Sequence, residues 1–89
     1  MKLRTLKITN IKGLHARASA KFVETVEKFD AQAEASRDGM SADGDSIMGL
    51  LMLAASMGTS IDVETKGLQA DQLMDALVAL VADKFGEGD

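Results

Sequence analysis

Apolar residues recur at two spacings along the chain, and these spacings predict its secondary structure. Over residues 16–29 and 70–85 they recur every three or four positions, which is typical of a helix with one apolar side. Over residues 31–36 and 61–64 they alternate with polar residues, which is typical of a strand with one buried face. Residues 2–9 predict a further strand, although their alternation is less regular.

Glycines and small polar residues mark the turns between these segments. Asp38-Gly39 predicts a two-residue hairpin, so we expect residues 40–43 to form the return strand. Ser46 is a good N-cap for a short helix that we expect to run from residue 47 to about residue 57, where Gly58 would end it. The last four residues, Gly-Glu-Gly-Asp, are expected to fray.

The order of these segments is strand, helix, strand, strand, helix, strand, helix, which predicts an α+β fold. Four strands and three helices are most simply arranged as one sheet with all helices on one face. The 89 residues are enough for one such core, so we expect residues 1–89 to form a single domain.

The composition excludes several classes of function. The net charge is −4, and the chain has neither Trp nor Tyr, so it lacks the net positive charge and most of the stacking surfaces that nucleic-acid binding needs. The chain has no cysteine and one histidine, so we expect no metal site and no disulfide. We find no apolar stretch that resembles a signal peptide, and the run at 47–57 is too short to span a bilayer. These features predict a cytoplasmic protein that does not insert into membranes.

The single histidine, His15, stands between a glycine-containing loop and the start of the first predicted helix. The first N–H groups of a helix have no partner within it, and the helix dipole is positive there, so a phosphate is favoured at this place. Arg17 could add a charge-assisted hydrogen bond, and the positive environment should keep His15 a neutral nucleophile. Gly13 would leave room for a partner or a phosphate to approach. Taken alone, His15 is more simply explained as an exposed loop residue or a helix cap.

Two segments resemble one protein family. Residues 13–17, Gly-Leu-His-Ala-Arg, followed by Ala-Lys-Phe-Val at 20–23, closely resemble the active-site segment of the histidine-containing phosphocarrier protein HPr of the bacterial phosphoenolpyruvate-dependent phosphotransferase system. Residues 46–50, Ser-Ile-Met-Gly-Leu, resemble the regulatory-serine segment of the same family. The two segments lie at the family's own separation, and the resemblance covers essentially the whole chain.

The resemblance implies a phosphoryl carrier rather than an enzyme, with no cofactor. His15 would accept the phosphoryl group on Nδ1 from phosphorylated enzyme I and pass it to a histidine of a IIA protein or domain. Arg17 would stabilise the phosphorylated state. The loop and helix start that support the phosphate would include Gly13, Ala16 and Ala18. The implied fold is an open-faced β-sandwich, an antiparallel sheet in the order 1-4-2-3 with three helices on one face.

Two features depart from what this resemblance would suggest. The family usually has proline after the active-site arginine, whereas this chain has Ala18, so we expect a looser helix start and slower transfer. The resemblance implies that an HPr kinase, in bacteria that have one, phosphorylates Ser46. Asp43 and Asp45 would repel that phosphate, and a plain N-cap is the simpler role for this serine. Both departures point weakly to the nitrogen-related branch of the system, and sugar uptake stays open.

The helix predicted after Ser46 is apolar nearly all round, more than a small core can bury. Methionine suits contact with several partners. The resemblance also places the partner-contacting surface here. On the first helix, Lys21 could meet acidic partners, although a solvated face explains it equally well. We expect a monomer that docks enzyme I and IIA proteins through Ile47, Met48, Leu51 and Met52.

Two other classes of function share some features of this sequence. An acyl carrier protein would carry its prosthetic arm on Ser46, which lies in an Asp-Ser-Ile context at a helix start, but that fold is all helical and this chain has predicted strands. A non-catalytic regulatory binding module would keep the predicted fold and make no use of His15.

Overall fold

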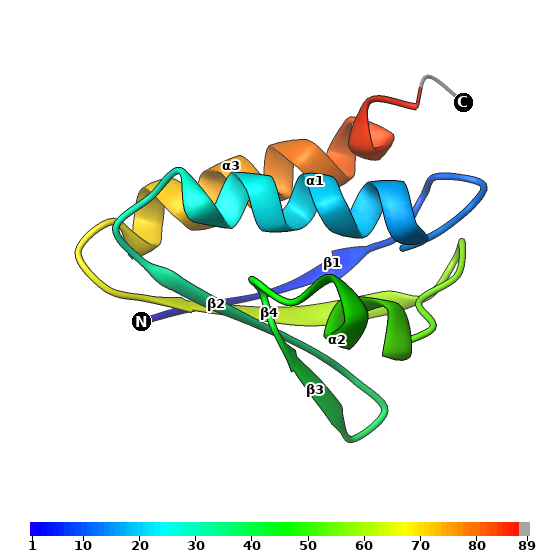
Figure 1. The fold of residues 1–89 in the computed structure, drawn as a ribbon, viewed down its shortest axis with the longest axis horizontal. Coiled ribbons are helices and arrows are strands. Elements are labelled where there is room, and N and C mark those ends of the chain that lie inside the picture. The colour runs from blue at the N-terminus through cyan, green and yellow to red at the C-terminus, as the bar shows by residue number, and fades with distance from the viewer. Residues whose placement is uncertain (88–89) are drawn as a thin grey trace.

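Four strands form one antiparallel sheet in the order β1-β4-β2-β3, as Figure 1 shows. This is seen in a computed structural model that describes residues 1–87. The strands are β1 (Lys2–Lys7), β2 (Gln32–Arg37), β3 (Met40–Asp43) and β4 (Ser60–Lys66). The expected α+β class and strand order are therefore confirmed.

The hairpin between β2 and β3 turns at the two residues that the sequence indicated. Asp38 and Gly39 both have positive φ angles, 51° and 81°. A two-residue turn with positive φ at both positions matches the twist of the strands it joins. The turn therefore fixes the register in which Ala35 lies opposite Ala42, and both are buried.

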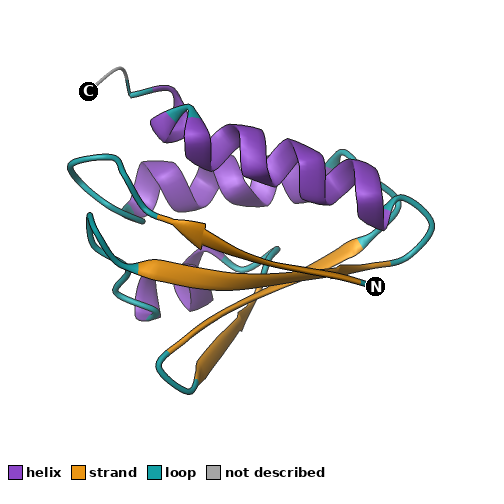
Figure 2. Ribbon diagram, turned by 180° about the vertical axis from the view of Figure 1, so that it is seen from behind, coloured by secondary structure: helices purple, strands orange, loops and turns teal. Residues whose placement is uncertain are grey.

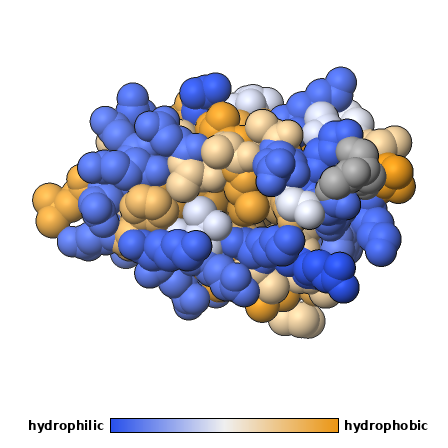
Figure 3. Space-filling model, turned by 90° about the horizontal axis from the view of Figure 1, so that it is seen from above, coloured by the Kyte–Doolittle hydropathy of each residue, from blue (hydrophilic) through white to orange (hydrophobic). Residues whose placement is uncertain are grey.

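Three helices accompany the sheet: α1 (Ala16–Glu27), α2 (Ile47–Met52) and α3 (Ala70–Ala82). The two long helices, α1 and α3, lie side by side over the sheet, as two opposite views show (Figures 1 and 2). Seen from above, their outer surface is mainly hydrophilic, with apolar residues gathered in a strip between the charged ones (Figure 3). The short helix α2 packs against α1 and β3.

The core lies between the inner face of the sheet and the helices. In α1 the buried side chains include Phe22, Val23 and Val26, as the spacing predicts. The apolar spacing over residues 16–29 begins at Ala16 and so predicts that this residue faces the core; this is wrong, because Ala16 is exposed and Ala18 is fully buried. Ala18 lies four positions before Phe22, so it faces the core one turn earlier.

Helix α2 is shorter than the sequence predicts. It ends at Met52, and Ala54 takes a positive φ of 52°, which stops the helix before Gly58 is reached. Leu53 and Ala55 are buried beyond its end. A short apolar segment buries its side chains in a helix or in an irregular segment alike, so periodicity alone misplaces this boundary.

The C-terminal segment is ordered against the rest of the molecule as far as residue 87. Helix α3 ends at Ala82, and a short 3-10 turn, η1 (Lys84–Gly86), follows it. Within this turn Phe85 is 1% exposed, so its ring anchors the segment in the core. The expectation that Gly86 and Glu87 fray is wrong for this reason; the last two residues of the tail lie outside the described part of the chain.

Candidate functional site

His15 is the N-cap residue of α1. Its backbone is extended, with φ −80° and ψ −176°, and its carbonyl accepts the first helical hydrogen bond from the N–H of Ser19 at 2.8 Å. The imidazole makes no capping hydrogen bond. The N–H groups of Ala16, Arg17 and Ala18 therefore have no partner among the described residues, and this helix start can bind an anion.

The loop before His15 is folded by its own hydrogen bonds. Asn10 is fully buried, and its Nδ2 donates to the carbonyl of Gly13 at 2.8 Å. The N–H of Gly13 in turn donates to the carbonyl of Asn10 at 3.1 Å, and Leu14 donates to the carbonyl of Ala55 at 2.8 Å. These bonds fix the point at which the chain enters α1, and with it the position of His15.

The structure gives Gly13 a different purpose from the one expected. Its φ is +66°, and a Cβ atom there would lie 2.5 Å from the carbonyl oxygen of Ala55. Gly13 is required because the chain's own backbone approaches it closely and because its φ is positive. The space beside Gly13 is therefore filled from within the molecule and is not room for a partner.

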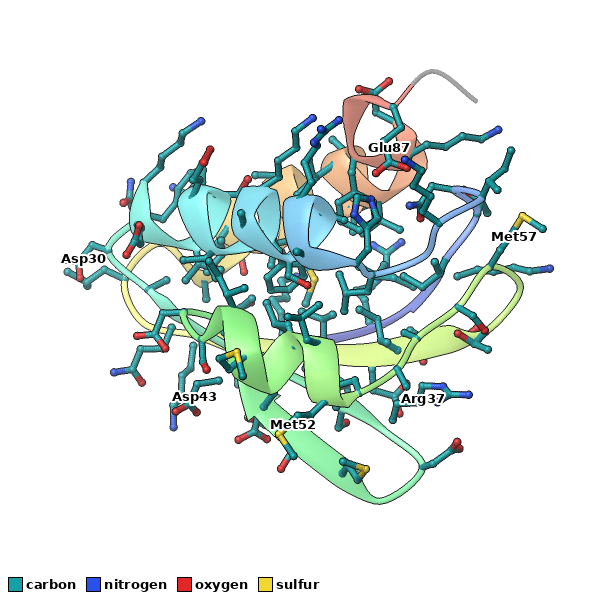
Figure 4. All side chains as sticks on the ribbon, turned by 45° about the vertical axis from the view of Figure 1, so that its right-hand side comes forward. Asp30, Arg37, Asp43, Met52, Met57 and Glu87 are labelled. Atoms are coloured by element: carbon teal, nitrogen blue, oxygen red, sulfur yellow. The ribbon has the colours of Figure 1, made fainter. Side chains whose placement is uncertain are left out.

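A carboxylate from the other end of the chain meets His15. Nε2 of His15 contacts Oε2 of Glu87, and Oε1 of Glu87 accepts a hydrogen bond from Nδ2 of Asn10 at 2.9 Å. Figure 4 shows Glu87 beside the start of α1. The His15 side chain is 26% exposed and that of Glu87 12% exposed, so the pair is partly shielded from water.

The charge of Glu87 decides which nitrogen of His15 carries the proton. The pKa of this carboxyl lies below its ordinary value of 4.5, and the hydrogen bond from Asn10 does most to lower it. The hydrogen bond to His15 and electrostatic attraction from His15 and Lys12 lower the pKa further, whereas burial raises it. Near neutral pH the group is an ionised carboxylate, which can only accept hydrogen bonds. The nitrogen that faces this carboxylate, Nε2 of His15, therefore carries a proton, and the tautomer that leaves the lone pair on Nδ1 is the one that this contact favours.

Sequence reasoning missed Glu87. A signal was present in Phe85, because a large aromatic residue in a polar tail has to be buried somewhere. Its burial brings the segment back to the start of α1.

Some of the other residues predicted around His15 are exposed, and others are buried or already hydrogen-bonded within the protein. Arg17 is exposed, and it has no ion-pair partner in the part of the chain that the structure describes, so its guanidinium is available to a phosphate. Ala16 is exposed beside it, whereas Ala18 is buried beneath the helix start. Lys21 is not a free surface cation, because its Nζ donates to the carbonyl of Phe85 at 2.6 Å.

Ser46 caps α2, as expected. Its Oγ accepts a hydrogen bond from the N–H of Gly49 at 3.0 Å. Asp43 and Asp45 nearby are exposed. The side chain of Ser46 therefore already binds an N–H group at this helix start, and two carboxylates lie on the residues just before it.

The residues predicted to dock partners form a surface on α2. Met48 is 70% exposed and Met52 is 65% exposed, whereas Ile47 is 39% exposed and Leu51 is half-buried. Leu50, between them, is fully buried. The helix therefore contributes to the core on one side and presents an apolar surface on the other (Figure 4).

Within residues 1–87 no three His, Cys, Asp or Glu side chains come together in a way that could hold a metal ion. The described helices are all too short or too polar to cross a membrane.

Comparison with known proteins gives consistent matches. Residues 2–83 match the model of a protein family described as "PTS HPr component phosphorylation site". The phosphocarrier protein HPr of Cupriavidus necator is 48% identical over 86 residues, 97% of each chain. The phosphocarrier protein NPr of Shewanella violacea is 42% identical over 84 residues, 94% of this chain and 92% of that one. A crystal structure of HPr from Thermoanaerobacter tengcongensis superposes with a TM-score of 0.93, at 39% identity, over 98% of each chain.

Proposed function

The chain belongs to the HPr family and is a phosphocarrier protein rather than an enzyme, and from this premise we propose that His15 accepts a phosphoryl group from phosphorylated enzyme I and passes it to a histidine of a IIA protein or domain. The observation that carries this assignment is the pairing of Nε2 of His15 with Glu87 at a helix start whose N–H groups are open.

Each part of the site has a role in this transfer. Nδ1 of His15 presents the lone pair that attacks phosphorus. The N–H groups at the start of α1 and the positive end of its dipole receive the phosphoryl oxygens. The exposed guanidinium of Arg17 adds a charge-assisted hydrogen bond to those oxygens. Ala18, where the family usually has proline, still lies inside a helix that begins at Ala16, so we expect its effect on the rate rather than on the chemistry.

Partners would dock on the apolar surface of α2. Its exposed side chains, Met48 and Met52, lie on α2, which packs against α1. Just beyond α2, the carbonyl of Ala55 accepts a hydrogen bond from the N–H of Leu14, next to His15, so a partner seated on α2 would lie close to the start of α1. Methionine adapts to differently shaped partners, and this carrier has to meet two.

A regulatory phosphate on Ser46 is a second, separate proposal. The serine oxygen already accepts the N–H of Gly49, and Asp43 and Asp45 would repel the added charge. Regulation at this site would be abandoned if Ser46→Ala left transport regulation in the native host unchanged. Whether the carrier serves sugar uptake or nitrogen-related regulation depends on which IIA proteins accept its phosphate.

The structure argues against both alternative functions, each for a different reason. An acyl carrier protein is all helical, and the four-stranded sheet excludes it. A binding module without covalent chemistry has no need of an exposed arginine beside an uncapped helix start with a histidine of fixed orientation.

The test is phosphorylation by a bacterial enzyme I with phosphoenolpyruvate, followed by intact-mass measurement. We expect one acid-labile phosphoryl group on the wild-type protein and none on His15→Ala. Circular dichroism of His15→Ala should show that the fold is unchanged. If several enzyme I homologues, including the nitrogen-branch type, leave the wild type unlabelled, the binding module becomes the better explanation.

A further inference from the structure

We propose that Glu87 is a positioning residue for phosphoryl transfer, which holds His15 in the form with the proton on Nε2, and that Asn10 holds Glu87 in place. This inference rests on the proposed function of His15. It assigns a task to a residue at the opposite end of the chain, and the contacts of three segments support it.

Asn10 links the carboxylate to the loop that carries His15. Its Nδ2 donates both to the carbonyl of Gly13 and to Oε1 of Glu87, at 2.8 and 2.9 Å. Its Oδ1 is buried with no hydrogen-bond partner among the described residues. If the amide were turned over, Oδ1 would face two acceptors, the carbonyl of Gly13 and Oε1 of Glu87. The amide therefore keeps the orientation that holds Glu87, although this leaves Oδ1 without a partner.

The backbone before Glu87 is turned back toward α1 at a conformational cost. Lys84 and Phe85 have positive φ angles of 55° and 56°, a region that residues other than glycine rarely adopt. The buried ring of Phe85 and the hydrogen bond from Nζ of Lys21 to its carbonyl hold this conformation. Residues 84–87 therefore form a strap that is fixed to the core at Phe85. At the end of this strap, the side-chain carboxylate of Glu87 contacts the imidazole of His15.

The position of Glu87 suits the charge that develops during transfer. The lone pair of Nδ1 forms a bond to phosphorus while the phosphorus–nitrogen bond of the donor histidine breaks and its electron pair returns to the donor nitrogen. The ring of His15 keeps the proton on Nε2 and so becomes a phosphorylated imidazolium. A carboxylate at Nε2 fixes the reactive tautomer beforehand and neutralises the positive charge afterwards, and onward transfer reverses these steps.

The test compares Glu87→Gln with the wild type and with Glu64→Gln, which neutralises a half-buried carboxylate on β4. Long-range proton–nitrogen NMR spectra of the unphosphorylated protein report which imidazole nitrogen carries the proton. We expect the wild type and Glu64→Gln to show the Nε2–H form, and Glu87→Gln to show a mixture of both forms, because an amide can either donate or accept. The kcat/KM for phosphorylation by enzyme I should fall about three- to tenfold in Glu87→Gln alone.

The two measurements separate the ways in which this inference can fail. An unchanged tautomer in Glu87→Gln would overturn it, even if the rate fell, because the carboxylate would then act on the partner and not on His15. An altered tautomer with an unchanged rate would remove the role in transfer. If the wild type is not labelled at all, the proposed function fails and the transfer role of Glu87 fails with it, while the spectra still show whether the pairing sets the tautomer.

Discussion

Two helix starts in this chain carry a side chain that we propose as a phosphorylation site, and they are built in opposite ways. At α2 the oxygen of Ser46 accepts the N–H of Gly49 and closes the helix. At α1 the imidazole of His15 makes no such bond, because Nε2 is directed to Glu87, and the first N–H groups stay open. Both N-cap residues have extended backbones, so the difference lies in the side chains and not in the course of the chain.

The charges around the two starts differ in the same sense. Arg17 lies in the first turn of α1 and Lys12 acts on the nearby carboxylate, whereas Asp43 and Asp45 precede α2. A side chain that caps its own helix stabilises the fold, and one that is held away from the helix leaves the N–H groups to a ligand. The comparison supports the proposal of covalent chemistry at His15, and at Ser46 the structure shows the capping role.

Removing the cation at the open helix start should have the largest effect. Arg17→Ala loses a charge-assisted hydrogen bond to the phosphoryl group, so kcat/KM for labelling by enzyme I should fall about ten- to a hundredfold. Arg4→Ala, which removes an exposed arginine on β1, is the matched control and should leave the rate unchanged. Equal rates for Arg17→Ala and the wild type would show that the positive charge beside His15 does not contribute to phosphoryl transfer.

A charge placed on the surface of α2 should slow transfer without unfolding the protein. Met48 is 70% exposed, so Met48→Glu should change the free energy of unfolding by less than about 0.5 kcal/mol. The kcat/KM for enzyme I should fall about tenfold, because a charge is buried when the partner docks. Leu68→Glu, at a position that is 88% exposed, serves as the control for an added charge. If Met48→Glu unfolds the protein, the side chain belongs to the core and not to a docking surface.

The two N-caps should also differ in stability. Ser46→Ala should lower the free energy of unfolding by about 1 kcal/mol, because the N–H of Gly49 loses its partner. Compared with Glu87→Gln, which already lacks the carboxylate that pairs with His15, the double variant His15→Ala, Glu87→Gln should lose less than this, since the imidazole caps nothing. Urea unfolding at neutral pH measures both losses, and an equal loss at the two N-caps would show that the His15 side chain stabilises its helix independently of Glu87.

The smallest expected effect is the pH dependence of the stability that the Glu87 carboxylate contributes. The pKa of Glu87 is lower in the folded protein than its ordinary value of 4.5, so the folded state favours the ionised form. Its stabilising contribution is complete above about pH 4.5 and is lost as the pH falls through the lowered pKa. The difference in unfolding free energy between the wild type and Glu87→Gln should therefore shrink below this pH. A difference that stays constant from pH 7 to pH 3 would contradict the pairing.

Much of this architecture could be predicted because it rests on local patterns. Alternating alanines predicted β2, and Asp38-Gly39 predicted the turn that sets its register with β3. The N-cap at Ser46 and the placement of His15 at a helix start depend on neighbouring residues alone, and both could be located from the sequence.

What could not be predicted depends on contacts between distant segments. Glu87 reaches His15 because Lys84 and Phe85 adopt positive φ angles, which the preferences of these residue types do not indicate. Gly13 is required by the approach of Ala55, some forty residues further along the chain. Lys21 resembles a solvated cation in the sequence, and only the returning C-terminal segment gives it a partner.

The most direct test of the account identifies the atom that carries the phosphoryl group. The protein is labelled uniformly with ¹⁵N, phosphorylated with enzyme I and phosphoenolpyruvate, and examined by NMR for coupling between phosphorus and the two imidazole nitrogens of His15. The account predicts phosphorus on Nδ1, with Nε2 facing Glu87. Phosphorus on Nε2 or on another residue would contradict it.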